Sequence, residues 1–174
     1  MDMTVRRQML NRNEWQKAMS DALDAGHGVN SAQQLERLAL QCQRAAKQTV
    51  SDWHFEQALG LAAQALVESG HHMQAARLYQ RLVQHHMDSL TYQGRSLASI
   101  QTALALTLFA AGKPGQALKH GLEALKWSGE FREPRQALQE LLGKIREVLA
   151  DKAKTHLRRQ GTTKAAGRSH GNKR

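Results

Sequence analysis

Apolar residues recur along the chain at intervals of three and four positions, which is the spacing of amphipathic helices. Ala, Leu, Gln, Arg and Lys dominate the composition and favour helix, and no segment shows the two-residue alternation of a strand. The sequence therefore predicts an all-α fold of about seven helices. The expected helices cover about residues 4–25, 32–48, 51–69, 73–87, 89–111, 114–127 and 133–154.

Between the periodic stretches, certain residue types indicate where several of the expected helices begin. Ser31, Ser51 and Ser89 each precede a periodic stretch and can act as N-caps, because a serine oxygen accepts a backbone N–H of the first turn. Pro114 and Pro134 follow breaks in the pattern, and proline is well tolerated in a first helical turn. These positions set the expected helix starts.

Glycine-containing breaks divide the chain into helix pairs of nearly constant length. The breaks lie at residues 25–28, 69–72 and 110–114, and an alanine follows each of them at a similar distance. These alanines, Ala32, Ala75 and Ala117, are 43 and 42 residues apart. A fixed period of this size is typical of a helical solenoid, in which each unit buries its apolar face against the next. Such a protein is expected to bind a partner rather than to catalyse a reaction.

Small and aromatic residues recur at matching places around these turns. Within residues 59–87, Ala63 precedes the turn at Gly70, and Ala75 and Tyr79 follow it. This pattern resembles the tetratricopeptide repeat (TPR), in which small residues let two helices approach closely and large ones fill the space beside them. The resemblance implies a right-handed solenoid of helical hairpins.

The chain departs from the TPR pattern in period and at one position. Its period of 42 or 43 residues exceeds the 34 of the common repeat and is similar to a long-period variety. Residues 104–127 repeat the pattern with Gly121 in the aromatic place, and the N-terminal third has Glu36 there.

TPR proteins receive a peptide or an amphipathic helix in a groove lined by the first helix of each pair, so the resemblance implies such a groove here. The groove lacks the clustered basic residues that hold a C-terminal carboxylate, which disfavours a chaperone-tail clamp. The expected function is that of a small bacterial-type adaptor, chaperone or regulator. The expected groove residues are Gln57, Gly60, Gln64, Val67, Glu68, Ser99, Thr102, Leu106 and Phe109.

Positive charge is concentrated at the C-terminal end. Residues 1–150 hold 17 Lys and Arg against 14 Asp and Glu, whereas residues 151–174 hold 8 against 1. From residue 159 onward there is no large apolar residue to bury, so we expect a helical domain over 1–158 and a disordered tail over 159–174. The basic residues are Lys152, Lys154, Arg158, Arg159, Lys164, Arg168, Lys173 and Arg174.

This basic tail supports an alternative function, non-specific binding of RNA or DNA by contacts to phosphates. It contains no Tyr, Phe or Trp that could stack on bases, so sequence-specific recognition is not expected. A purely solubilising tail is the other interpretation.

Motifs for catalysis or metal binding are missing from the sequence. The neighbouring histidines at 71–72 and 85–86 point about 100° apart on a helix, and no Cys or carboxylate lies at ligand spacing. No P-loop, dinucleotide fingerprint or nucleophile elbow occurs. We therefore expect no metal, no cofactor and no enzymatic activity.

The remaining expectations concern compartment and core. The lone Cys42 lies in a helical pattern and is expected to be buried in a reducing, cytoplasmic protein without membrane spans. Trp15, Trp53 and Trp127 are interpreted as core residues, with a partner anchor as the alternative. The sequence does not decide whether two copies form a homodimer through the end faces of the solenoid.

Overall fold

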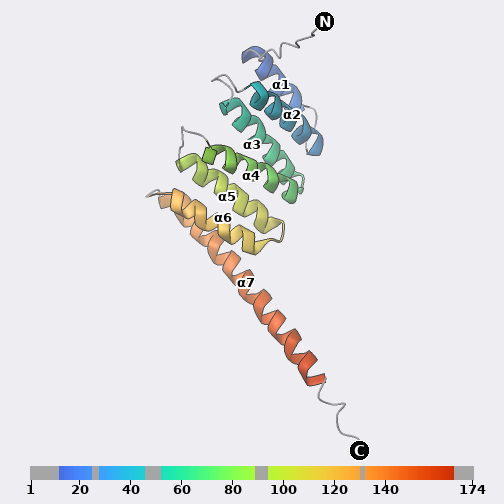
Figure 1. Ribbon diagram of the computed structural model, residues 1–174, viewed down its shortest axis with the longest axis vertical. Coiled ribbons are helices and arrows are strands. Elements are labelled where there is room, and N and C mark those ends of the chain that lie inside the picture. The colour runs from blue at the N-terminus through green and yellow to red at the C-terminus, as the bar shows by residue number, and fades with distance from the viewer. Residues whose placement is uncertain (1–11, 25–27, 46–51, 89–93, 130–131, 167–174) are drawn as a thin grey trace, which may run out of the picture.

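The computed structural model describes residues 12–24, 28–45, 52–88, 94–129 and 132–166 (Figure 1). Over these residues the chain is helical throughout and contains no strand, so the all-α prediction is confirmed. The helices are α1 (Arg12–Asp24), α2 (Val29–Ala45), α3 (Asp52–Glu68), α4 (His72–Asp88), α5 (Gly94–Ala110), α6 (Pro114–Trp127) and α7 (Arg132–Ala166).

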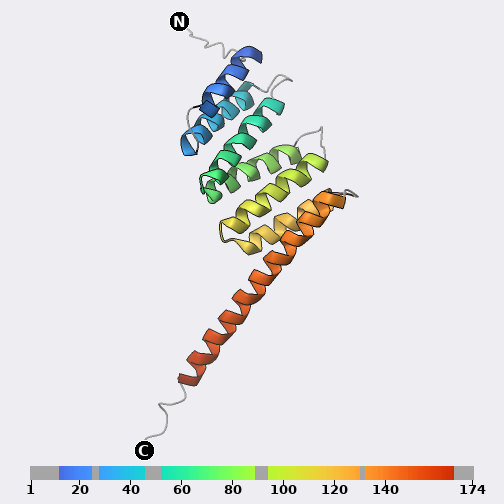
Figure 2. The same cartoon turned by 180° about the vertical axis from the view of Figure 1, so that it is seen from behind.

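The helices form a stack in chain order. Each helix from α1 to α6 packs mainly against its neighbours along the chain, and α7 packs on α6 with a smaller contact to α5. Figures 1 and 2 show that the C-terminal half of α7 leaves the stack and extends away from it as a single helix.

The turn between α3 and α4 is stabilised by two backbone hydrogen bonds. Gly70 has a φ of +79° and donates its N–H to the carbonyl of Val67 at 3.0 Å, while the N–H of His71 reaches Leu66 at 2.8 Å. This is the Schellman arrangement, which satisfies carbonyls at the end of a helix and favours glycine because of the positive φ.

The turn between α5 and α6 repeats the same arrangement. Gly112, with a φ of +73°, bonds to Phe109 at 3.0 Å, and Lys113 bonds to Leu108 at 2.9 Å. Gly70 and Gly112 therefore have the same structural role, ending the first helix of two successive hairpins.

The periodic alanines also occupy equivalent places. Ala32, Ala75 and Ala117 are buried, and each donates its N–H at 3.0 Å to the carbonyl four residues earlier, closing the first turn of α2, α4 or α6. In the first hairpin the acceptor is Gly28, so α2 begins at Val29. The predicted start after Ser31 is wrong, because the helix has already begun at that residue.

The core has two clusters joined through α4. One lies among α1 to α4 around Leu35, Phe55 and Leu59, and the other lies among α4 to α7 around Leu104 and Ile145. Tyr79 packs against both clusters, so α4 links the two halves of the stack.

Helix bounds agree with the sequence in part. The fourth and sixth helices match to within about one residue. The described part of the fifth helix begins at Gly94. The start predicted after Ser89 falls in residues 89–93, which lie outside the described residues, as do Ser51 and residues 1–11.

The last helix is longer than predicted. It continues to Ala166 instead of ending near residue 154, so residues 159–166 are helical and the disordered tail expected from 159 is not confirmed. The prediction relied on burial, but a helix that has formed adds one hydrogen bond per residue, and Ala, Lys, Arg and Gln all favour its extension. Residues 167–174 lie outside the described residues.

Candidate functional site

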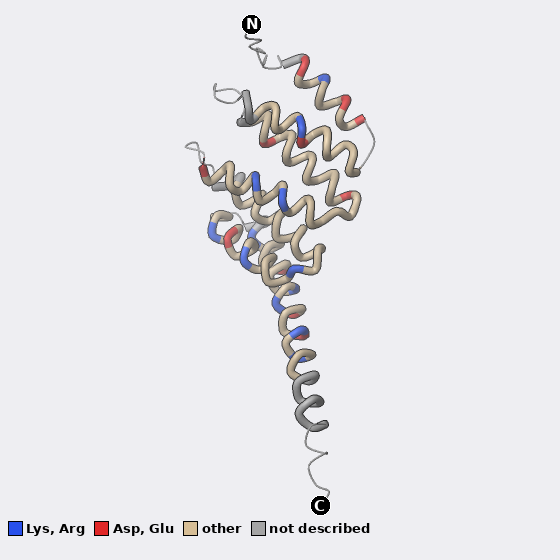
Figure 3. Tube along the Cα trace, turned by 45° about the vertical axis from the view of Figure 1, so that its right-hand side comes forward, with Lys and Arg blue, Asp and Glu red and all other residues tan. Residues whose placement is uncertain are grey.

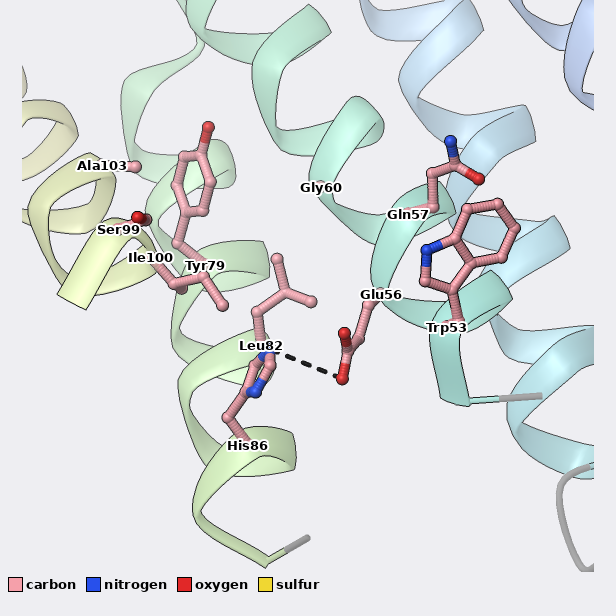
Figure 4. Close-up of a pocket in the computed structure, with 10 residues that line it drawn as sticks. All are labelled: Trp53, Glu56, Gln57, Gly60, Tyr79, Leu82, His86, Ser99, Ile100 and Ala103. Atoms are coloured by element: carbon pink, nitrogen blue, oxygen red, sulfur yellow. Dashed lines mark ion pairs between the residues drawn. The ribbon is translucent and has the colours of Figure 1, made fainter. Parts of the chain in front are cut away.

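A groove of about 550 Å³ opens between α3 and α5, with α4 between them (Figure 4). Its lining combines polar, aromatic and aliphatic side chains from these three helices. The lining residues are Trp53, Glu56, Gln57, Gly60, Tyr79, Leu82, His86, Ser99, Ile100 and Ala103.

Helix α3 contributes one face to this groove. Trp53, Gln57 and Gly60 follow one another at helical spacing, and no neighbouring side chain occupies the space a Cβ on Gly60 would enter. The same face continues to Gln64, whose Nε2 donates to Glu68 Oε1 at 2.9 Å. The groove wall formed by α3 is thus polar, and at Gly60 it consists of backbone alone.

Trp53 is the most exposed aromatic residue of this groove. Its side chain is 60% exposed, whereas Trp15 is 6% exposed and lies with its ring centroid 5.7 Å from that of Trp53. The core prediction therefore holds for Trp15 and is wrong for Trp53 and for Trp127, which is 36% exposed. The buried aromatic residue of α3 is Phe55, which the sequence analysis did not single out and which lies on the opposite side of the first turn.

Glu56 is flanked by two histidines of α4. Its Oε1 lies 3.4 Å from His86 Nε2 and 3.6 Å from His85 Nε2. Burial lowers the pKa of His86, because desolvation disfavours the charged imidazolium. A neutral His86 leaves Glu56 as the source of negative charge on this side of the groove.

His85 of α4 packs on Phe55 with ring centroids 4.6 Å apart. Within the described part of the chain, no group of three or more His, Cys, Asp or Glu side chains is arranged to hold a metal ion.

The floor and the α5 wall are more apolar. Leu82 is buried, and Ile100 and Tyr79 are half-buried. Burial raises the pKa of Tyr79, and the Glu68 carboxylate raises it further, so the phenol stays protonated and can donate a hydrogen bond. Ser99 and Ala103 line the opposite side, and Leu106, one turn further along α5, is 50% exposed.

The structure separates the predicted groove residues into three groups. Gln57, Gly60 and Ser99 line the groove. Gln64, Glu68 and Leu106 are exposed, and they continue the same helix faces by their spacing.

The other predicted groove residues point away from this surface. Val67 and Phe109 pack against the core clusters. Thr102 is half-buried and donates to the carbonyl of Ala98 at 2.8 Å. The predicted positions therefore lie on two helices that border this groove, but some of them are one step around the helix from the side that faces it.

Charge differs between the groove helices and the C-terminal helix (Figure 3). Together α3, α4 and α5 hold four Asp and Glu against three Lys and Arg, whereas α7 holds nine Lys and Arg against four Asp and Glu. The groove helices are therefore nearly balanced in charge, whereas the projecting helix is basic.

The predicted polyanion-binding residues lie on or beyond α7. Lys152 and Lys154 are exposed, and Lys154 Nζ lies 3.6 Å from an oxygen of Asp151. Arg158, Arg159 and Lys164 lie within α7, and Arg168, Lys173 and Arg174 lie outside the described residues.

The comparisons with known proteins assign no role to the groove. Neither a protein-family model nor a curated protein sequence matches the chain. Among the helices of the described residues, none combines the length and apolar character needed to cross a membrane.

Proposed function

We propose that this chain is a non-catalytic adaptor, chaperone or regulator that binds a protein segment in the groove between α3 and α5. In this proposal the stacked hairpins form a TPR-like, right-handed solenoid. The observation that carries the proposal is the open groove of about 550 Å³ beside the exposed Trp53. Exposed aromatic residues at a concave surface are typical anchors of protein interfaces.

The shape and chemistry of the groove suit a helix or an extended segment. Leu82 and Ile100 can receive apolar side chains, while Gln57 and Ser99 offer hydrogen-bonding groups at the edges. Recognition of a helix by a groove relies on such apolar anchors at helical spacing.

Affinity purification from the source organism with matched leucine variants would test this proposal. Leu106→Arg places a charge on the groove side of α5, and Leu122→Arg makes the same change on α6, where the leucine is also exposed. We expect Leu106→Arg and Trp53→Ala to lose a partner that the native protein and Leu122→Arg retain. Equal recovery by all four proteins, with unchanged circular dichroism, would contradict the proposal.

A second candidate function is non-specific RNA or DNA binding by the C-terminal helix. Residues 150–157 are all exposed, so this part of α7 is available to a polyanion. We expect duplex DNA binding to fall steeply with salt and to be lost when Lys152, Lys154, Arg158 and Arg159 become Gln. Unchanged binding by this variant would exclude the helix as the contact.

A further inference from the structure

The half of α7 that leaves the stack is an exposed basic helix. Leu149 packs against the core cluster of α4 to α7, whereas residues 150–157, which follow it, are all exposed. Figures 1 and 2 show this half of α7 apart from the other helices. Residues 152–166 hold five Lys and Arg and neither Asp nor Glu. This part of the helix therefore carries positive charge that no other element covers in the described part of the chain.

The sequence of this half offers little to stabilise a single helix in water. Such helices are stabilised by pairs of opposite charge three or four residues apart. Asp151 supplies one such pair, with its oxygen 3.6 Å from Lys154 Nζ, and both side chains are exposed. One turn later, Lys154 and Arg158 have the same charge at a spacing of four residues, which disfavours helix. An anionic ligand that neutralises these residues would therefore stabilise this half of α7.

The basic positions occupy more than one side of the helix. Lys152 and Arg159 share one side of α7, because seven residues make nearly two turns. Lys154 and Arg158, one turn apart, share a second side, about 130° around the helix from the first. A helix that lies on a membrane or another flat anionic surface presents only one face to it. Charge on two separate sides instead suits a ligand that places anions on both flanks of the helix.

The wider arc between these two sides is largely uncharged. It contains Ala150, Ala153 and Leu157, and the side chain of Leu157 is 67% exposed. Lys164 lies on the same arc near the end of the helix. This half of α7 thus combines a side of mostly small or apolar residues with a basic side on each flank.

The major groove of duplex DNA matches this arrangement. The groove is about 12 Å wide and admits an α-helix, and each of its walls is a phosphate backbone. Small and apolar side chains let a helix approach the base edges, while Lys and Arg at the flanks contact phosphates. Because residues 150–166 form one uninterrupted helix of about 24 Å at 1.5 Å per residue, they are long enough to lie along the groove.

Other nucleic acids match this helix less well. The major groove of an RNA duplex is deep and narrow, so it does not admit a helix. Single strands are held largely by aromatic side chains that stack on bases, and residues 150–174 contain no Tyr, Phe or Trp. Duplex DNA is therefore the ligand that the shape and charge of α7 favour.

We propose that the projecting half of α7 binds duplex DNA by lying in its major groove. The side with Ala150, Ala153 and Leu157 faces the base edges, and the two basic sides contact the phosphates of opposite strands. This inference rests on the second candidate function, nucleic-acid binding, and specifies the nucleic acid and the groove. Because small apolar side chains distinguish bases poorly, the binding is not sequence-specific, and the stack stays free to hold a protein partner.

Fluorescence anisotropy with the full-length protein tests this proposal. The probes are a labelled DNA duplex, an RNA duplex of the same sequence and one of the DNA strands alone. We expect the DNA duplex to bind at least about tenfold more tightly than the other two. Bulky groups on the pyrimidines that fill the major groove should weaken binding by a similar factor, whereas a drug bound in the minor groove should not.

Ala153→Pro separates the helix from its charge. Proline inside a helix breaks it, while every Lys and Arg is kept. This variant should lose the preference for the DNA duplex and retain only binding that does not discriminate among the three probes. Ala153→Ser is the matched control, because it makes a small change at the same residue and leaves the helix intact. Circular dichroism verifies that the stack is folded, and the helical signal of the native protein should rise when the DNA duplex is added.

Four outcomes would overturn the inference. Equal binding of the RNA and DNA duplexes would leave the second candidate function standing but exclude the major groove. Equal binding of the DNA duplex by Ala153→Pro would show that a flexible polycation is sufficient. Tighter binding to anionic lipid vesicles than to DNA would assign the helix to a membrane surface. Binding to none of the nucleic acids at low salt would refute the second candidate function as well, whereas the leucine variants above test the protein-binding groove independently of α7.

Discussion

Gly121 of α6 lies so close to Leu142 of α7 that a Cβ at residue 121 would be 2.8 Å from Leu142 Cδ2. Both residues are buried, and Ala105 of α5 borders the same space. The absence of a side chain at 121 therefore lets α7 pack directly on the hairpin formed by α5 and α6.

Gly121→Val should destabilise the protein by about 1–3 kcal/mol, because added methyl groups overpack this contact. Urea unfolding measures the change. Leu142→Ala in the same protein should recover part of the loss by vacating the space, giving a coupling energy in a double-mutant cycle.

Gly143→Ala is the matched control for this prediction. Residue 143 is also a helical glycine, but apart from its chain neighbours and the adjacent backbone of its own helix, no atom lies within 4 Å of the position of its Cβ. We expect this variant to be neutral or more stable by up to about 1 kcal/mol, because alanine favours helix. Similar losses at 121 and 143 would argue against the close contact as the cause.

Gly112→Ala should lower the free energy of unfolding by about 1–2 kcal/mol, because residue 112 has a φ of +73° that an L side chain adopts only at a cost. Gly112→Asn should lose less, since asparagine tolerates this conformation better. Thermal unfolding of the two variants provides the comparison, and an alanine variant as stable as the native protein would refute the prediction.

Stability should fall as the pH is lowered from about 7 toward 5. Burial lowers the pKa of His120, and the charge of Lys119 lowers it further, while burial also lowers the pKa of His86. Both folded-state imidazoles thus resist protonation, whereas the unfolded chain binds protons from about pH 6.5 downward. Because the unfolded state then binds more protons, stability is fully present above this pH and is lost below it.

His120→Gln isolates one contribution to this pH dependence. Nδ1 of His120 lies 2.8 Å from Oε1 of the buried Gln101, and a glutamine amide can make a similar hydrogen bond without titrating. Urea unfolding at about pH 7.5 and 5.5 should show a smaller loss for the variant than for the native protein. Identical losses of unfolding free energy in the two proteins would show that His120 does not contribute to the pH dependence.

The repeat position shared by Glu36, Tyr79 and Gly121 shows how far the sequence alone could lead. Spacing of 43 and 42 residues aligned the three, but it could not predict what each contacts. Glu36 binds Arg81 of the next hairpin at 2.6 Å, Tyr79 packs between two core clusters, and Gly121 admits Leu142. Each outcome depends on a side chain from another helix, which local periodicity does not encode.

The helices themselves were predictable because their periodicity and glycine stops are local signals. The Gly70 and Gly112 turns lie where the pattern placed them. The sequence did not predict the length of α7 or the exposure of Trp53. Both depend on which surfaces the other helices cover, and local periodicity does not encode this. The predicted groove positions lie on α3 and α5, which border the groove seen in the structure, but only Gln57, Gly60 and Ser99 of them line it.

Trp53→Ala and Trp15→Ala form a pair that distinguishes a surface anchor from a core residue. Trp15 is 6% exposed within the first core cluster, so its loss should cost about 3–5 kcal/mol of unfolding free energy. Trp53 is 60% exposed, and its loss should cost less than about 1 kcal/mol. Urea unfolding followed by circular dichroism avoids relying on the fluorescence of the deleted indoles. A large loss on Trp53→Ala would mean that the indole supports the fold, and the effect of this variant on partner binding could then no longer be assigned to the groove. A small loss, with partner binding abolished, would mean that a large aromatic side chain is kept in solvent for recognition.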